Sequence, residues 1–292
     1  MTGPASAGAR PSVAVVIPAL DEEATVASVV AAAMPHVESG LVAHVLVVDS
    51  DSSDATADEA RRAGARVINW REAHHRRHDG VAPRPGKGEA LQRGLAAAMA
   101  AGADVVCFLD GDVSNTGVGW VPELVGPLLS TWADPEPVRL VKGHYRRDLD
   151  GDVGGGRVTE LTARPLLTAL APELADVRQP LGGEYAARCD SLAPLRFPVD
   201  YGVEISLLMQ VADRWGRGAV SEVDLGARRH RNRPLKELAP MAHQVLAGAL
   251  RARGLPVGEE LAARSGAELP PLEDGVGGAP TRPDDARGEV LP

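Results

Sequence analysis

The sequence predicts an α/β fold in which an open, mostly parallel β-sheet is flanked by helices. Two observations carry this prediction. Short β-branched apolar runs alternate along the chain with segments of helical periodicity, which is the pattern of β-α-β units. Three of these runs are followed directly by acidic and small polar residues, as expected where the carboxyl ends of parallel strands form a binding edge.

The amino-terminal half supplies most of this pattern. Val13–Ile17 is a β-branched run closed by Pro18, and the apolar residues after Thr25 recur at helical spacing, with Thr25 or an acidic neighbour as the cap. We then expect a strand, a helix, a short strand, a second helix and another strand, at His44–Asp49, Asp54–Ala63, Arg66–Asn69, Gly88–Ala101 and Asp104–Leu109.

The carboxyl-terminal half is less regular, but its elements can also be placed. We expect in order a helix, a strand, a glycine-rich turn, two helices, a strand and an amphipathic helix, at Val121–Ser130, Arg139–Tyr145, Gly151–Gly156, Arg157–Leu170, Glu204–Trp215, Ala219–Leu225 and Leu235–Arg253. Residues 1–12 are predicted to be a flexible terminus and 263–292, rich in Gly, Pro and acidic residues, a disordered tail. Residues 13–262 then form one domain.

Charge and composition exclude several functional classes. A formal net charge of -9 argues against a general nucleic-acid binder, because affinity for a phosphate backbone needs a basic surface. The two cysteines, Cys107 and Cys189, have no metal-binding or disulfide spacing, which fits a reducing cytoplasm. No apolar run approaches the length of a membrane span and no leader opens the chain, so we expect a cytoplasmic protein.

Asp110 and Asp112 follow the apolar strand Val105–Leu109, where a turn can aim both carboxylates at one cation. Carboxylate oxygens suit Mg²⁺ or Mn²⁺, and such an ion could neutralise the charge of a diphosphate leaving group. The alternative is an ordinary surface turn, in which Asp and Gly are common. The pattern alone leaves both interpretations open.

Two further segments are candidate anion sites. Lys87 lies on a glycine-flanked turn at a helix start, where an ammonium and backbone N–H groups can meet phosphate oxygens. Gly154–Thr159 combines three glycines with a guanidinium, from Arg157, and a hydroxyl. A helix-start lysine without a ligand and a flexible glycine link are the alternatives.

Three stations along the chain resemble the A-type, or GT-A, glycosyltransferases. Val16–Glu22, Val47–Asp54 and Asp110–Asp112 occupy in order the positions where that superfamily binds its donor. The resemblance implies that the first loop contacts the uracil and ribose, that Ser50 lies near the nucleotide, and that the fold is GT-A. The first-loop residues concerned are Pro18, Ala19, Leu20 and Glu22. Glu22 could equally stabilise the start of the following helix.

A second group of motifs narrows the resemblance to the glucosyl-3-phosphoglycerate synthases. Matching segments extend over nearly the whole chain from Val13 to Leu250, at Pro83–Leu91, Leu140–Arg147, Gly154–Glu160, Gln179–Glu184, Tyr201–Glu204 and Arg229–Pro234. The resemblance implies metal-dependent transfer of glucose, with UDP-glucose the favoured donor, to the 2-hydroxyl of 3-phosphoglycerate with retention. It further implies a homodimer, a nucleotide-sugar half at 13–115 and an acceptor half at 116–262.

The same resemblance implies a role for individual residues. Asp110 and Asp112 with His230 would bind the metal, and Lys87 would face the donor diphosphate. The acceptor would be held by Gly156, Arg157, Thr159 and Asn232. Glu204 and Glu184, together with Asp112, are the candidate catalytic residues. No general base is assigned, because the leaving phosphate can itself take the acceptor proton.

Other functions share parts of this pattern. A mannosyl-3-phosphoglycerate synthase using GDP-mannose differs by one sugar hydroxyl and a few contacts to the base. A polyprenyl-phosphate sugar transferase fits the first half, although the hydrophobic anchor expected of such an enzyme is missing. A sugar-1-phosphate nucleotidyltransferase would have a glycine-rich, arginine-containing loop where Pro18–Glu22 stands. A domain without activity would not need the paired carboxylates.

Overall fold

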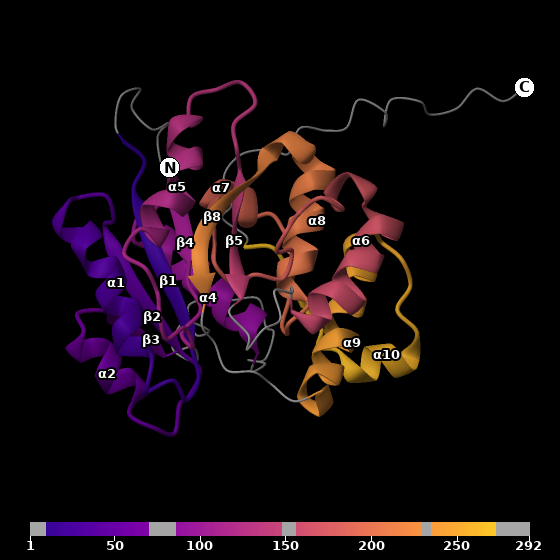
Figure 1. Ribbon diagram of the computed structural model, residues 1–292, viewed down its shortest axis with the longest axis horizontal. Coiled ribbons are helices and arrows are strands. Elements are labelled where there is room, and N and C mark those ends of the chain that lie inside the picture. The colour runs from indigo at the N-terminus through magenta and orange to yellow at the C-terminus, as the bar shows by residue number, and fades with distance from the viewer. Residues whose placement is uncertain (1–9, 70–85, 148–155, 229–234, 273–292) are drawn as a thin grey trace, which may run out of the picture.

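The computed structural model describes residues 10–69, 86–147, 156–228 and 235–272. These residues form one seven-stranded sheet with helices on both faces, and a small two-stranded sheet beside it (Figure 1). The main sheet has the order β3-β2-β1-β4-β6-β5-β8. Its strands are β1 (Val13–Ala19), β2 (His44–Asp49), β3 (Arg66–Asn69), β4 (Val105–Phe108), β5 (Leu140–Arg147), β6 (Tyr185–Arg188) and β8 (Val220–Arg228).

Neighbouring strands are parallel except around β6, which runs antiparallel to both β4 and β5. The predicted α/β class with a mostly parallel sheet is therefore confirmed. Because β6 runs in the opposite direction, its first residue lies at the edge of the sheet where the parallel strands end. This places residues 182–184 beside the loop that follows β4.

Two layers of apolar side chains cover the two faces of the sheet. On one face β1, β2 and β4 pack against helices on the left of Figure 1, α1 (Val26–Glu38) and α2 (Thr56–Arg62), and against α5 (Trp120–Ser130). The other face is covered by elements that include α4 (Lys87–Ala100), η1 (Thr159–Ala163), α6 (Arg164–Leu170), η2 (Pro172–Leu174), α7 (Cys189–Leu192), α8 (Val203–Trp215) and α9 (Leu235–Ala252). Strands buried on both faces explain why β1 and β2 are continuous apolar runs.

The expected helices and strands agree with the structure to within about three residues at each end, as boundaries read from a pattern usually do. β6 is the main element that the sequence did not indicate. It is short, and its sequence shows no alternation of polar and apolar residues because both of its faces are buried. Within the described residues no helix is both long and apolar enough to cross a membrane.

The packed chain also continues beyond the boundary expected at residue 262. Helix α10 (Glu259–Arg264) is followed by β9 (Glu268–Leu269), which pairs antiparallel with β7 (Phe197–Pro198). The Gln92 side chain donates to the carbonyl of Pro270 at 2.8 Å, and Leu269 is buried. Residues 263–272 therefore belong to the folded domain, because the apolar residues Leu269 and Leu272 and backbone pairing hold a segment whose composition alone indicates disorder.

Candidate active site

The carboxyl ends of β1, β2 and β4 bring the three expected loops together at one edge of the sheet. Pro18 and Ala19 end β1, Ser50 follows β2, and the backbone N–H of Ser50 donates to the carbonyl of Ala19 at 3.0 Å. The side chain of Leu20 is 54% exposed beside this contact.

The loops after β1 and β2 are joined by hydrogen bonds between side chains of one and backbone N–H groups of the other. The Asp21 carboxylate accepts from the Ser53 N–H at 2.7 Å, and the Glu22 N–H donates to the Thr56 hydroxyl at 2.7 Å. Asp21 has a φ of 54°, a left-handed conformation that is costly for most residues but tolerated by Asp. The network fixes the backbone around Glu22 before any ligand binds.

Thr25 connects these loops to the loop after β4. Its hydroxyl donates to the carbonyl of Gly111 at 2.7 Å and lies 3.2 Å from an Oε atom of Glu22. Thr25 is the N-cap residue of α1, as expected, but its side chain makes no capping hydrogen bond. The Thr25 hydroxyl instead links Glu22, which is predicted to bind the sugar donor, to the loop of Gly111, which is predicted to bind the metal.

Lys87 forms the centre of a charged cluster. Its Nζ lies 2.8 Å from Oδ1 of Asp110 and 2.7 Å from Oε1 of Glu204. Burial alone would lower the pKa of Lys87, but the two carboxylates outweigh it and hold the pKa well above its ordinary value. Lys87 is therefore a permanent cation that joins α4, the end of β4 and the first turn of α8.

Close backbone packing places Lys87 at this point. The N–H of Gly88 donates to the carbonyl of Val199 at 3.0 Å, and a side chain at Gly88 would overlap the carbonyl of Pro198. The glycines that flank Lys87 therefore serve the approach of two backbones, and the start of α4 is pressed against β7. The N-terminal end of a helix also favours an anion near Lys87.

Asp110 rests directly on the backbone of Gly183. A side chain at residue 183 would overlap the Asp110 carboxylate and displace it, so glycine is required for this position of Asp110. The Asp110 side chain is still partly exposed, and Asp112, two residues on, is half-buried. Two carboxylates that solvent can reach are a suitable donor set for Mg²⁺ or Mn²⁺.

The third expected metal ligand, His230, lies outside the described residues, as does Asn232. Among the side chains that the structure does describe, no group of three or more His, Cys, Asp or Glu residues is placed to bind a metal ion. The described part of β8 ends at Arg228, at the edge of the sheet that carries Asp110 and Asp112.

The two glutamates proposed for the catalytic step have different surroundings. Glu204 belongs to the Lys87 cluster and is 3% exposed. Glu184 is fully buried, and its backbone carbonyl accepts a hydrogen bond from the N–H of Gly143 at 2.9 Å. Its carboxylate raises the pKa of Cys107, after the larger effect of burial, and Cys107 belongs to the opposite face of the sheet.

The candidate acceptor residues lie at the start of a helical run, 157–170. The carbonyl of Gly156 accepts a hydrogen bond from the backbone N–H of Glu160 at 3.0 Å. Arg157 is exposed, and Thr159 is buried. Thr159 begins η1, a π-helical turn that packs against α9. Widened turns of this kind are frequent at functional sites, and no sequence pattern indicated this one.

Two buried residues beside the cluster were not identified from the sequence. Lys142 on β5 pairs in register with Tyr185 on β6, and its Nζ lies 4.7 Å from the centre of the Tyr185 ring. Both lie on the face of the sheet that α4 and α8 cover. The one available signal was a lysine directly after the apolar residues Leu140 and Val141 that begin β5, because buried lysines are rare.

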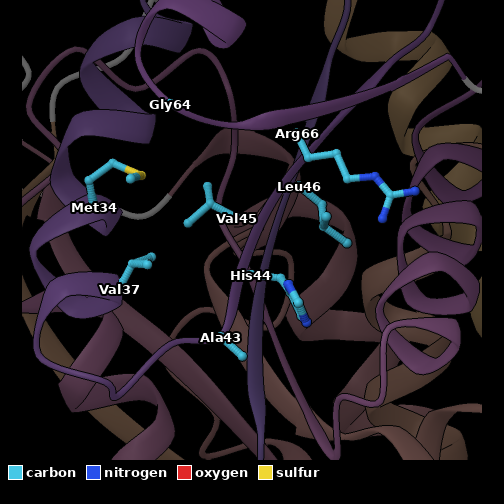
Figure 2. Close-up of a pocket in the computed structure, with 8 residues that line it drawn as sticks. All are labelled: Met34, Val37, Ala43, His44, Val45, Leu46, Gly64 and Arg66. Atoms are coloured by element: carbon cyan, nitrogen blue, oxygen red, sulfur yellow. The ribbon is translucent and has the colours of Figure 1, made fainter.

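A cavity of about 200 Å³ lies at a different place, beside the amino-terminal ends of β2 and β3 (Figure 2). It is lined by Met34, Val37, Ala43, His44, Val45, Leu46, Gly64 and Arg66. Parallel strands begin at this edge of the sheet and end at the edge that carries Lys87, Asp110 and Glu204. The cavity is therefore separate from the candidate active site.

Comparison with known proteins identifies the family of this chain. The family model for glycosyl transferase family 2 matches residues 14–135. A glucosyl-3-phosphoglycerate synthase of Mycolicibacterium paratuberculosis is 49% identical over 259 residues, covering 86% of this chain and 75% of that protein. One from Petrotoga mobilis is 36% identical over 244 residues, covering 80% and 70%.

This chain belongs to the glucosyl-3-phosphoglycerate synthase family. A crystal structure of the Mycobacterium tuberculosis member, in complex with Mn²⁺, UDP-glucose and phosphoglyceric acid, has a TM-score of 0.78 and 46% identity, with 90% of each chain covered. Another, of the same protein with Mg²⁺ and UDP, has a TM-score of 0.75. The expected GT-A glycosyltransferase family is confirmed, and the chain is a glycosyltransferase.

Proposed function

We propose that this protein transfers glucose from UDP-glucose to the 2-hydroxyl of 3-phosphoglycerate, with retention at the anomeric carbon and with Mg²⁺ or Mn²⁺ as cofactor. The observation that carries the proposal is the Lys87–Asp110–Glu204 cluster at the end of β4. It joins a cation suited to a diphosphate, a carboxylate suited to a metal, and a buried glutamate. The Mycobacterium tuberculosis relative that shares this fold has a crystal structure in complex with Mn²⁺, UDP-glucose and phosphoglyceric acid.

The donor would lie across the joined loops after β1 and β2. Pro18, Ala19, Leu20 and Glu22 would contact the uracil and ribose, with Ser50 beside the nucleotide. Asp110 and Asp112, with His230, would hold the metal ion, which when bound supplies positive charge to the leaving diphosphate. Lys87 would add a second positive charge from the protein itself, at the start of α4.

The acceptor would approach from the other half of the chain. Gly156 and Arg157 lie at the start of a helical run, where backbone N–H groups and a guanidinium favour a phosphate or carboxylate. Thr159 and Asn232 would complete this site. Glu204 would position the reacting hydroxyl or the sugar, and Glu184, from behind the sheet, would influence that position through its backbone.

A change of partner accompanies binding in this proposal. In the structure Lys87 is held by Asp110 and Glu204. A donor diphosphate and a metal ion would give Lys87 and Asp110 new partners of opposite charge. Glu204 would then be able to accept a hydrogen bond from a sugar or acceptor hydroxyl. The ion pairs thus keep the buried charges compensated before substrate arrives.

We further propose that the enzyme is a cytoplasmic homodimer, with a donor half at 13–115 and an acceptor half at 116–262, against which residues 263–272 pack. Cys107 and Cys189 are both buried as free thiols, which is compatible with a reducing compartment. Light scattering of the purified protein would measure its oligomeric state. A monomer at working concentration would contradict the dimer without affecting the proposed reaction.

The proposed reaction is tested by product formation from 3-phosphoglycerate with UDP-, ADP- and GDP-glucose and GDP-mannose, with and without Mg²⁺ or Mn²⁺. We expect metal-dependent α-glucosyl-3-phosphoglycerate, identified by mass and by the anomeric NMR signal, with UDP-glucose preferred. Mannosyl product from GDP-mannose would reassign the donor. No transfer to 3-phosphoglycerate from any donor, by folded protein, would overturn the proposal and direct the search to polyprenyl phosphates.

A further inference from the structure

Lys142 occupies a position where a charged side chain is costly. It is 1% exposed and lies in a row across three strands, in which Phe108 of β4 pairs with Tyr185 of β6 and Tyr185 pairs with Lys142 of β5. The rings of Phe108 and Tyr185 are 4.9 Å apart between centres. An apolar residue at 142 would continue this row, so packing alone does not account for a lysine.

The ammonium of Lys142 has two specific contacts. Its Nζ donates a hydrogen bond to the carbonyl of Gly182 at 2.5 Å and lies over the face of the Tyr185 ring. Both contacts involve the chain segment that enters β6. A hydrogen bond from a buried cation is stronger than one between neutral groups, so it fixes the Gly182 peptide firmly.

The Gly182 peptide in turn sets the position of Asp110. Gly183, the next residue, supports the Asp110 carboxylate so closely that a Cβ would overlap it. A shift of the Gly182 carbonyl moves Gly183, and Asp110 must follow or lose its support. A connected path therefore leads from Lys142 through two glycines to the carboxylate that pairs with Lys87.

Charges around the path favour a cation at residue 142. Three carboxylates act on it, from Glu204 on α8, Glu184 before β6 and Asp110 after β4, and one cation, Lys87 on α4, opposes it. Tyr185 is the neutral titratable group that faces it. Burial nevertheless dominates and lowers the pKa of Lys142 to about 8. A buried ammonium such as that of Lys142 lowers the stability of the folded protein, which points to a role in arranging the site.

We propose that Lys142 is a positioning residue: it holds the Gly182–Gly183 turn in place and thereby orients Asp110 for the metal and the donor diphosphate. Lys142 does not touch the substrates in this proposal. The inference rests on the proposed function for its kinetic consequences, but the binding of UDP with Mn²⁺ tests it separately.

The test compares two substitutions with a matched control. Lys142→Met keeps the volume of the side chain and removes both its charge and its hydrogen bond, whereas Lys142→Gln keeps a shorter donor without the charge. Arg139→Met removes a cation that stacks on Trp215 just before β5, at the opposite edge of the sheet. Gly183→Ala, which displaces Asp110 directly, shows the result expected of a misplaced carboxylate.

For Lys142→Met we expect a kcat about 10 to 100 times lower, because a misplacement of about 1 Å can cost 100-fold, and about tenfold weaker binding of UDP with Mn²⁺ by calorimetry. Gly183→Ala should reproduce both effects, and Lys142→Gln should be intermediate. The KM for 3-phosphoglycerate should change less than threefold, roughly the scatter of a neutral change. Arg139→Met should retain wild-type kcat.

Two results would overturn the role of Lys142: a folded Lys142→Met protein with wild-type kcat and wild-type affinity for UDP with Mn²⁺, or equal losses in Arg139→Met. Circular dichroism and thermal unfolding establish that each variant is folded, and Lys142→Gln serves if Lys142→Met is not. If the wild-type enzyme does not transfer glucose, the proposed function fails, while the UDP and Mn²⁺ titrations still decide whether Lys142 positions Asp110.

Discussion

The donor loops and the Lys87 cluster lie at the same edge of the sheet but are built in different ways. The loops after β1 and β2 are joined by several exposed hydrogen bonds, in which backbone N–H groups of one loop donate to side-chain oxygens of the other. The cluster joins α4, β4 and α8 through two ion pairs on one lysine. Many small contacts can be lost one at a time, whereas removing one charge from a buried set leaves another uncompensated.

The largest expected effect is therefore in the cluster. Asp110→Ala removes a predicted metal ligand and one of the two partners of Lys87. We expect kcat/KM for UDP-glucose to fall by about 100- to 1,000-fold, the size typical of a lost charge-stabilising group. Initial rates with Mn²⁺ measure this, and Asp134→Ala, in an exposed turn after α5, is the control. A loss of less than tenfold would show that the cluster does not carry the reaction.

A second prediction concerns the pH dependence of stability at Lys142. Its pKa is about 8 in the folded protein and 10.5 when unfolded, so the unfolded state binds more protons between these values. The cost of burying the cation is present below pH 8 and disappears as the pH rises towards 10.5. The stability of Lys142→Met relative to wild type should thus fall by up to about 3 kcal/mol over this range.

Urea denaturation of wild type and Lys142→Met at pH 7, 8, 9 and 10.5 measures that difference in stability. The effects of other groups that titrate in both proteins cancel in the difference. Arg139→Met should show no such trend. A difference between Lys142→Met and wild type that is constant across the range would mean that Lys142 is not a buried cation, and would remove the electrostatic part of its proposed role.

The donor loops and the Lys87 cluster also differ in how much of each the sequence predicts. The donor loops follow strands that β-branched runs mark clearly, so Pro18, Ser50 and Asp110 could be placed at one edge. Lys87 and Glu204 were each identified, but their pairing depends on how α4 packs on β7 and on where α8 begins. No spacing rule contains that information.

Most of the other contacts that the sequence did not predict involve the antiparallel strand β6. Its direction brings Gly183 to Asp110 and Tyr185 to Lys142, and these contacts cannot be inferred from a four-residue strand buried on both faces. Thr25 shows the opposite case. Its position as N-cap was predictable, but tertiary contacts direct its hydroxyl to Gly111 instead of the helix.

On the donor side we expect a smaller effect from Thr25→Val. The substitution keeps the shape of the side chain and removes the hydroxyl that donates to Gly111. One hydrogen bond contributes about 1 kcal/mol, so the KM for UDP-glucose should rise about fivefold with kcat little changed. Steady-state kinetics measure both constants. Thr168→Val, which removes a hydroxyl bonded within α6, is the control. A fall in kcat as large as that of Asp110→Ala would erase the distinction between the two regions.

The smallest expected effect is at Asp54, in the network that joins the loops after β1 and β2. A hydrogen bond from the Thr56 side chain has the largest effect on the pKa of Asp54 and lowers it. Burial opposes this effect, but backbone hydrogen bonds from Thr56 and Glu23 also lower the pKa, which lies below its ordinary value. A carboxylate whose pKa is depressed on folding contributes stability above the unfolded pKa of 3.8, and that contribution is lost as the pH falls through the folded value. Asp54→Asn should therefore have a slightly lower urea midpoint than wild type at pH 6, and the two midpoints should converge as the pH falls below 3.8. Asp58→Asn, which alters an exposed ion pair with Arg61 on α2, is the control. The contribution of Lys142 to stability changes between about pH 8 and 10.5, whereas that of Asp54 changes at acidic pH. Titrating both variants therefore separates the contribution of the buried charges from that of the hydrogen-bonded loops. A midpoint difference for Asp54→Asn that does not change with pH would show that the carboxylate charge is not what holds the donor loops together.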